Sequence, residues 1–155
     1  MDLTPYRLGP GDVTLKDVLT LIQTTFADME GRIDPPSSMH WLTLESVTKQ
    51  AETGEVWGIG DPVQACVFLT PRPYSLYLGK LAVARDAQRQ GLARRLIALA
   101  RSRAEDLGLP NVELQTRIEL VENHATFEAL GFREIARTAH PGYDRPTSIT
   151  YRLSL

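Results

Sequence analysis

The chain has 155 residues, of which 43% are hydrophobic and 23% charged, and its formal net charge is −2 at pH 7. This length and composition predict one globular domain over residues 1–155, and the mildly acidic balance argues against nucleic acid as the main partner. The single cysteine, Cys66, excludes an intramolecular disulfide. Because there is no basic-then-apolar leader and no apolar run of about 18 residues, we expect no membrane partner and a cytoplasmic location.

The first third of the chain predicts one strand and two helices. A short strand is expected over residues 5–9. Asp12 is a good N-cap for an amphipathic helix over 13–29, in which apolar side chains recur at intervals of three and four residues. Thr43 is expected to cap a second, shorter helix over 44–53.

Residues 30–43, between these two helices, form a long loop that contains two adjacent prolines. A loop of this length is typical of a binding segment. Its polar and aromatic candidates are Arg32, Asp34, Ser37, Ser38, His40 and Trp41. The alternative is a rigid loop in which Trp41 and Met39 cover the hydrophobic core, and the sequence favours neither interpretation.

Three strands follow over residues 55–60, 63–69 and 74–83, separated by turn signals rich in glycine and proline. Cys66 lies in the apolar run of the second strand and is expected to be a small core residue rather than a nucleophile. The third strand leads through a polar turn into a helix over 91–107. The buried stripe of this helix is predicted to consist of Leu92, Leu96, Leu99, Ala100, Ala104 and Leu107.

The turn before this helix has the pattern Gln88-x-x-Gly91-x-Ala93. A glycine at a helix start lets the backbone approach a ligand closely, and the N–H groups of the first helical turn have no partner inside the helix. Those donors and the positive end of the helix dipole predict an anion site suited to phosphate. Six arginines lie in or after the turn: Arg85, Arg89, Arg94, Arg95, Arg101 and Arg103. The alternative for the helix arginines is a solvated helix face.

The last third of the chain predicts a strand over 112–116, a helix that begins at residue 122 or at Asn123 and ends at residue 130, and two strands over 132–139 and 148–153. One central strand-helix-strand unit is thus flanked by hairpins. This order predicts a mixed sheet with helices on both faces.

Two segments together resemble the GNAT superfamily of N-acetyltransferases. Gln88-Arg-Gln-Gly91-Leu-Ala93 is similar to the Q/R-x-x-G-x-G/A signature of motif A. The segment Asn123-His-Ala-Thr-Phe127-Glu-Ala-Leu-Gly131-Phe132 is similar to motif B. The resemblance extends over residues 55–155. It implies an α/β (α+β), single-domain fold, with a mixed, mostly antiparallel central sheet of six to seven strands flanked by about four helices.

The same resemblance implies a function. It predicts transfer of an acetyl group from acetyl-CoA, without a metal, to a primary amine of a small molecule or peptide, and it allows a homodimer. The alternatives from other classes are a non-catalytic CoA-binding sensor or interaction module, and an interaction domain whose arginine-rich helix meets an acidic partner.

The resemblance also assigns the cofactor site by position. The backbone amides of residues 88–94 would bind the pyrophosphate, and the backbone of Leu81 and Val83 would pair with the pantetheine arm like an added strand. Asn123 would hydrogen-bond that arm; it could also be a plain helix N-cap, and the two roles are compatible. Arg89 and Arg94 would meet CoA phosphates. The full predicted contact set is Leu81, Ala82, Val83, Gln88, Arg89, Gln90, Gly91, Leu92, Ala93, Arg94, Asn123 and Phe127.

The catalytic residues are not settled by the resemblance. Phe127 stands where many family members have the tyrosine that protonates the departing thiolate, and Tyr143 or water is a possible replacement. The strand before the turn contains no carboxylate or histidine to act as a base. Candidate bases from elsewhere are Glu30, Asp34, His40, Glu113 and His140. A weak base would favour an acceptor amine of low pKa, because less free energy is needed to deprotonate it.

Overall fold

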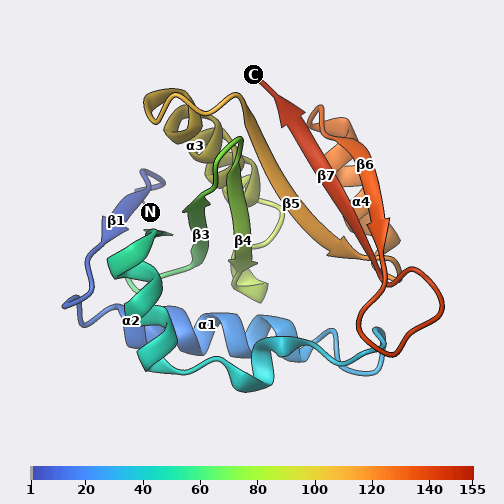
Figure 1. Ribbon diagram of the computed structural model, residues 1–155. Helices are drawn as coiled ribbons and strands as arrows, with labels where there is room; N and C mark the ends of the chain where they lie inside the picture. The colour runs from blue at the N-terminus through green and yellow to red at the C-terminus, as the bar shows by residue number, and fades with distance from the viewer. Residues whose placement is uncertain (1) are drawn as a thin grey trace.

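The computed structural model describes residues 2–155 of the chain, except the side chains of Met39 and His40 (Figure 1). The strands are β1 (Tyr6–Leu8), β2 (Glu55–Ile59), β3 (Ala65–Pro71), β4 (Leu76–Val83), β5 (Asn111–Arg117), β6 (Arg133–Thr138) and β7 (Ser148–Ser154). The α-helices are α1 (Leu15–Ala27), α2 (Leu44–Thr53), α3 (Leu92–Asp106) and α4 (Val121–Ala129). Two short 3-10 helices are η1 (Ser38–Trp41) and η2 (Arg85–Ala87).

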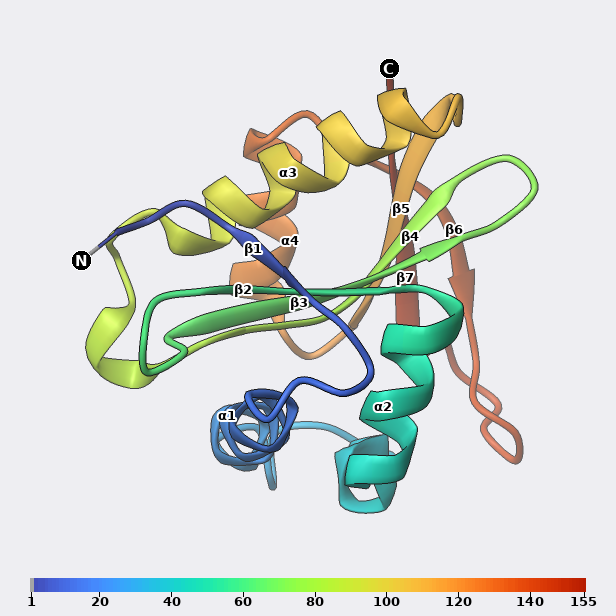
Figure 2. The same ribbon diagram turned by 90° about the vertical axis from the view of Figure 1, so that its left-hand side faces the viewer.

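The seven strands form one sheet in the order β1-β2-β3-β4-β5-β7-β6. Strands β4 and β5 run parallel, and the other neighbouring pairs are antiparallel. Helices α3 and α4 cover one face of the sheet, and α1 and α2 cover the other (Figure 1 and Figure 2). The predicted mixed, mostly antiparallel sheet of six to seven strands with about four flanking helices is therefore confirmed.

Each face of the sheet has its own hydrophobic core. The core under α3 and α4 contains buried side chains such as Leu96 and Tyr151, and the core under α1 and α2 contains Ile22 and Cys66. Cys66 is fully buried, which confirms it as a small core residue, and burial raises the pKa of its thiol to about 12. Leu107 was expected in the buried stripe of α3, but it is 42% exposed because the helix ends before it.

The N-cap of α1 differs from the residue that the sequence predicts, and the N-cap of α2 is the predicted one. The N-cap of α1 is Thr14 and not Asp12, because the helix begins only at Leu15; the Asp12 carboxylate accepts a hydrogen bond from the backbone N–H of Thr14 at 2.9 Å, in the turn before the helix. Thr43 is the N-cap of α2, as predicted, and exchanges hydrogen bonds with Ser46 in a capping box.

Strands β4 and β5 pair only at their beginnings, where Leu76 lies opposite Val112 and Tyr77 opposite Glu113. Beyond that point the two strands diverge (Figure 1). The pairing of β4 with β3 also changes register, and Lys80 within this irregularity has a φ of 51°. A bulge of this kind bends its strand and locally disrupts the ladder. The sheet is thereby opened into a wedge at its centre.

Candidate functional site

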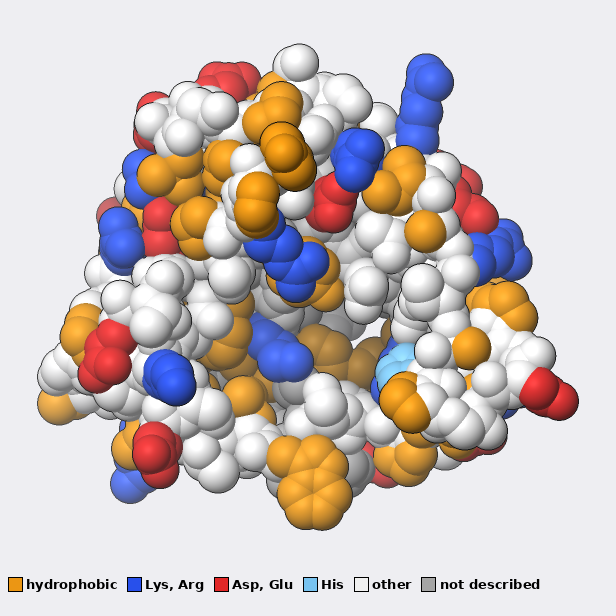
Figure 3. Space-filling model, viewed as in Figure 1, with side chains coloured by type: hydrophobic (Ala, Val, Ile, Leu, Met, Phe, Trp, Pro, Cys, Tyr) orange, Lys and Arg blue, Asp and Glu red, His pale blue; other side chains and the backbone are white. Residues whose placement is uncertain are grey.

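A cavity of about 630 Å³ occupies the wedge between β4 and β5. Its wall is built by both strands, by the loop between α1 and α2, by α4 and by the start of the loop between β6 and β7. Figure 3 shows the face of the molecule in which it opens, with basic side chains in the hollow. Trp41 is 82% exposed and lines this cavity, so it does not cover the core.

The glycine turn lies at the end of β4 and begins α3. Gly91 has a φ of +79° and precedes the first residue of the helix, while an added Cβ would meet nothing within 4 Å. The first helical hydrogen bond runs from the N–H of Arg95 to the carbonyl of Gly91 at 3.0 Å, so the amides of residues 92–94 have no acceptor inside the helix. The turn thus presents backbone donors without a partner inside the helix, and glycine is required by its φ rather than by crowding.

The arginines around the turn fall into two groups. Arg85 is paired with Asp28 at 2.7 Å, and Arg103 with Glu55 at 2.8 Å. Arg89 and Arg94 are exposed, and neither forms an ion pair with the part of the chain that the structure describes. The guanidinium groups of Arg89 and Arg94 are therefore without an acidic partner in the described part of the chain, whereas Arg85 and Arg103 each connect α3 or the turn before it to another element.

The predicted cofactor contacts on β4 differ in where their side chains lie. Leu81 lines the cavity, whereas the side chain of Ala82 is buried in the core on the α1 face. Gln88 donates to the carbonyl of Val83 at 3.5 Å and so ties the turn to the strand end. Leu92 is buried in the other core, which leaves its amide as the group that faces the turn.

The second predicted motif lies on α4, where Asn123 and Phe127 both line the cavity. Asn123 is the third residue of the helix and donates to Thr116 Oγ1 at 3.5 Å, so its alternative role as an N-cap is wrong. Phe127 packs against Phe132 and Tyr151, with ring centroids 5.9 and 6.2 Å away. The second motif thus lines the same cavity as Leu81, on the strand that leads into the first motif.

Three catalytic candidates lie away from the cavity. Tyr143 is half-buried and donates to Asp34 Oδ1 at 2.5 Å. Glu113 accepts a hydrogen bond from Arg152 Nε at 2.8 Å, across the β5–β7 pair. Glu30 is exposed at the end of the α1 segment and does not line the cavity. The side chain of His40 lies outside the described residues.

His140 is the candidate base that does line the cavity. Its Nδ1 is in hydrogen-bond contact with Oγ1 of Thr147, a fully buried residue, and its backbone N–H donates to the same oxygen at 3.0 Å. Burial and the Arg117 guanidinium lower the pKa of His140, although Glu119 acts in the opposite direction. The imidazole is therefore held in its neutral form at pH 7.

Three loops meet beside the cavity in a polar cluster that we call the Asp34 clamp, comprising Asp34, Arg117, Glu119, Tyr143 and Arg145. The Asp34 carboxylate accepts from Tyr143 Oη and from Arg145 Nη2 at 3.3 Å, and its backbone N–H donates to Glu119 at 3.0 Å. Arg117 donates to the carbonyls of residues 35 and 36 at 2.6 and 3.2 Å. The clamp joins the α1–α2 loop to the end of β5 and to the β6–β7 loop.

Lys80 and Arg117 also line the cavity and were not among the sequence candidates. Each is a single basic residue within a strand, and only the divergence of β4 and β5 brings both to one space. Among the described side chains, no group of three His, Cys, Asp or Glu residues lies close enough together to hold a metal ion. Within residues 2–155, no helix is both long and apolar enough to cross a membrane.

Comparisons with known proteins agree with this geometry. The model of the acetyltransferase (GNAT) family matches residues 17–132. The ribosomal-protein-S18-alanine N-acetyltransferase from Escherichia coli is similar in structure, with a TM-score of 0.72 at 23% identity over 97% of this chain and 92% of that chain. A search of curated proteins gave no match.

Two further similar structures contain the cofactor or its product. A GNAT family acetyltransferase from Elizabethkingia anophelis with acetyl-CoA bound has a TM-score of 0.69 at 17% identity, over 98% of this chain and 97% of that chain. An acetyltransferase from Bacillus subtilis in complex with CoA has a TM-score of 0.67 at 20% identity, over 97% of both chains. The structural matches show a shared fold, and because the family model also spans most of the sequence, the chain belongs to the GNAT family of acetyltransferases.

Proposed function

We propose that the protein is an acetyl-CoA-dependent N-acetyltransferase that moves an acetyl group to a primary amine of a small molecule or peptide by direct attack. The observation that carries this proposal is that β4, unpaired with β5 beyond Tyr77, leads directly into the Gly91 turn at the start of α3. The turn offers free amides for the pyrophosphate, and the wedge offers β4 backbone for the pantetheine arm.

In this arrangement Arg89 and Arg94 add charge-assisted donors to the phosphates of acetyl-CoA. The arm then runs past Leu81 and Val83, with Asn123 on the opposite wall, so that the thioester enters the 630 Å³ cavity. The acceptor amine enters the same cavity from the side of the α1–α2 loop and the β6–β7 loop.

The reaction forms a C–N bond to the acetyl carbonyl carbon and breaks its C–S bond. One proton leaves the amine and the thiolate of CoA departs. We assign the proton to His140 Nε2. Thr147 Oγ1 lies 3.4 Å from the carbonyl of Thr138, and when its hydroxyl donates there, Nδ1–H of His140 donates to Thr147 and Nε2 keeps its lone pair.

Phe127 lines the cavity but has no proton to give to the thiolate. A thiol of pKa about 8.5 is roughly 1.5 pKa units above neutral pH, so unassisted departure costs about 2 kcal/mol. We propose that water supplies this proton, because the fold keeps Tyr143 at Asp34 and away from the cavity. The cytoplasmic location and the homodimer stay predictions.

Calorimetric titration with acetyl-CoA and with CoA tests the cofactor assignment. We expect micromolar binding to the wild type and its loss in Gly91→Glu, because a carboxylate would enter the anion site. Gly108→Glu is the matched control, since Gly108 lies at the other end of α3 with a φ of +69° and equal space around it. No binding to the wild type, or equal loss in both variants, would contradict the assignment.

Turnover is then measured as release of the CoA thiol with a library of amines. The buried Cys66, with its thiol pKa raised to about 12, adds no background in the folded protein. Binding of acetyl-CoA without turnover of any amine would favour the non-catalytic sensor over the enzyme.

A further inference from the structure

The charged side chains that line the cavity in the wedge, among the residues that the structure describes, are all basic. Among the described residues that line the cavity, the ionisable basic side chains are Lys80, Arg117 and His140, and no aspartate or glutamate is among them. Figure 3 shows basic side chains within the hollow. A cavity of this charge disfavours a polycationic acceptor and favours one that brings a negative group with it.

The two strong cations differ in their surroundings. The Arg117 guanidinium donates to two backbone carbonyls and lies near Glu119 and Asp34, whose charges oppose the lowering of its pKa by burial. For Lys80, burial is the sole cause that lowers the pKa, and no ion pair or hydrogen bond joins its ammonium group to the described part of the chain. Lys80 is therefore the cation of the cavity that still needs a partner.

The position of Lys80 adds a second, independent observation. It lies at the bulge of β4 with a φ of 51°, a backbone conformation that is uncommon for a lysine. Non-glycine residues in this region cluster at ligand sites. An unpaired, half-buried charge also costs free energy that a ligand anion at this point would recover.

The anion has to come from the acceptor rather than from acetyl-CoA. In the proposed function the CoA phosphates lie at the Gly91 turn, and the acetyl thioester that enters the cavity is uncharged. We propose that the acceptor is an amine that also carries a carboxylate, such as a free amino acid, and that Lys80 holds this carboxylate. This inference rests on the proposed function and names its substrate class.

Binding of products tests the inference without interference from amine ionisation. A panel of N-acetyl amino acids and the matching N-acetyl amino amides, with apolar, polar and charged side chains, is titrated into the protein loaded with CoA. We expect the best acid to bind about tenfold or more tightly than its amide. Turnover of the corresponding amino acids and amino amides is then measured with acetyl-CoA.

Lys80→Met should remove the difference between acid and amide while changing the acetyl-CoA Kd by less than about twofold. Lys80→Arg should keep the preference, because it keeps the charge. Lys16→Met, on the exposed face of α1, is the matched control and should behave as the wild type.

Equal binding of acids and amides, or no binding of any acid by the CoA-loaded wild type, would overturn the inference. A Lys80→Met variant that loses acetyl-CoA instead of the acid would overturn it as well, because Lys80 would then belong to the cofactor site. In each of these cases the proposed function would still hold if the wild type binds acetyl-CoA and acetylates an amine without a carboxylate. Failure of the wild type to bind acetyl-CoA would instead contradict the proposed function.

Discussion

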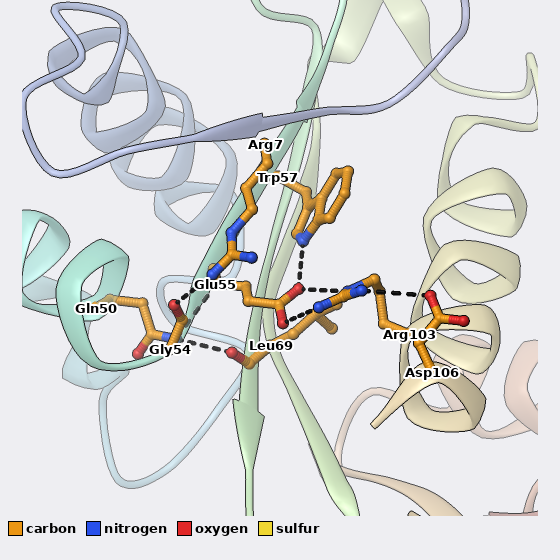
Figure 4. A network of polar contacts seen from close by, with 8 residues as sticks. All are labelled: Arg7, Gln50, Gly54, Glu55, Trp57, Leu69, Arg103 and Asp106. Carbon is orange, nitrogen blue, oxygen red and sulfur yellow. Dashed lines mark hydrogen bonds and ion pairs between the residues drawn. The ribbon is translucent and has the colours of Figure 1, made fainter. Parts of the chain in front are cut away.

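Two polar networks of similar size lie in different surroundings. In the Glu55 network, the Glu55 carboxylate accepts from Trp57 Nε1 at 2.8 Å and from Arg103 Nε and Nη2 at 2.9 and 2.8 Å, and Arg103 also reaches Asp106 (Figure 4). Glu55 is 3% exposed and joins β2 to α3. Burial alone would raise its pKa, but the bonds from Arg103 and Trp57 bring the pKa of this carboxyl below its ordinary value.

The Asp34 clamp makes about as many hydrogen bonds, but its ion pair between Asp34 and Arg145 is exposed. The side chains of Asp34 and Arg145 are 62% and 47% exposed. Exposed pairs gain little free energy because water competes for both partners, whereas a buried charge that loses its partner is left without solvent. The Glu55 network is therefore expected to contribute more to stability than the exposed Asp34–Arg145 pair of the clamp.

The largest expected effect is on stability. Arg103→Met leaves Glu55 buried without its partner and should lower the free energy of unfolding by about 3 kcal/mol, measured by urea denaturation. Acetyl-CoA binding at low temperature should persist, because Arg103 lies outside the site. Arg101→Met on the same helix, with a 4.0 Å exposed pair to Glu105, is the control and should be close to the wild type.

The next largest effect is expected at His140, the proposed base. His140→Gln should lower kcat/KM by about 100-fold with little change in stability. Only the neutral imidazole accepts a proton, and the pKa of His140 is lowered from its ordinary value of about 6.5. The kcat/KM of the wild type should therefore fall on acidification only below about pH 6.5. The variant should lack this step in the pH profile. His124→Gln, whose ring contacts the Arg117 carbonyl and does not line the cavity, is the control.

Phe127→Tyr changes a residue of the cavity wall that belongs to neither polar network. A phenol there can protonate the thiolate, so kcat should rise by up to about 30-fold at pH 7 if departure of the thiolate limits the rate. Single-turnover measurements at several pH values would show the gain shrinking above the thiol pKa. An unchanged rate would mean that another step limits turnover.

The smallest expected effect is on the clamp itself. Asp34→Asn weakens its contacts to Tyr143 and Arg145 and should lower kcat/KM for the acceptor about three- to fivefold, with little change in the melting temperature. Glu134→Gln, which breaks a comparable exposed pair with Arg137 on β6, should leave kcat/KM unchanged. A large loss of stability in Asp34→Asn would erase the distinction between the two networks.

Much of the fold could be predicted because its signals are local. Apolar spacing marks α1 and α3, and Thr43 caps α2 within three residues of its own position. The predictions that differ from the structure were also local: Thr14 rather than Asp12 is the N-cap of α1, and α4 begins at Val121, one residue before the earlier of the two predicted starts. The N–H of Asn123 donates to the carbonyl of Leu120 at 3.0 Å, so Asn123 already lies within the first turn of α4, and helix ends vary by a residue or two.

The sequence by itself determined the helices and strands, the glycine turn and the motif at Asn123, because each depends on side chains within one helical turn or one strand. The tertiary structure alone decided which candidates face the cavity. Asp34 meets Tyr143 across 109 residues of chain, and Arg117 meets Pro35 across 82. Lys80 enters the wedge through a bulge and a change of register, and such pairings between distant strands leave no pattern in the neighbouring sequence.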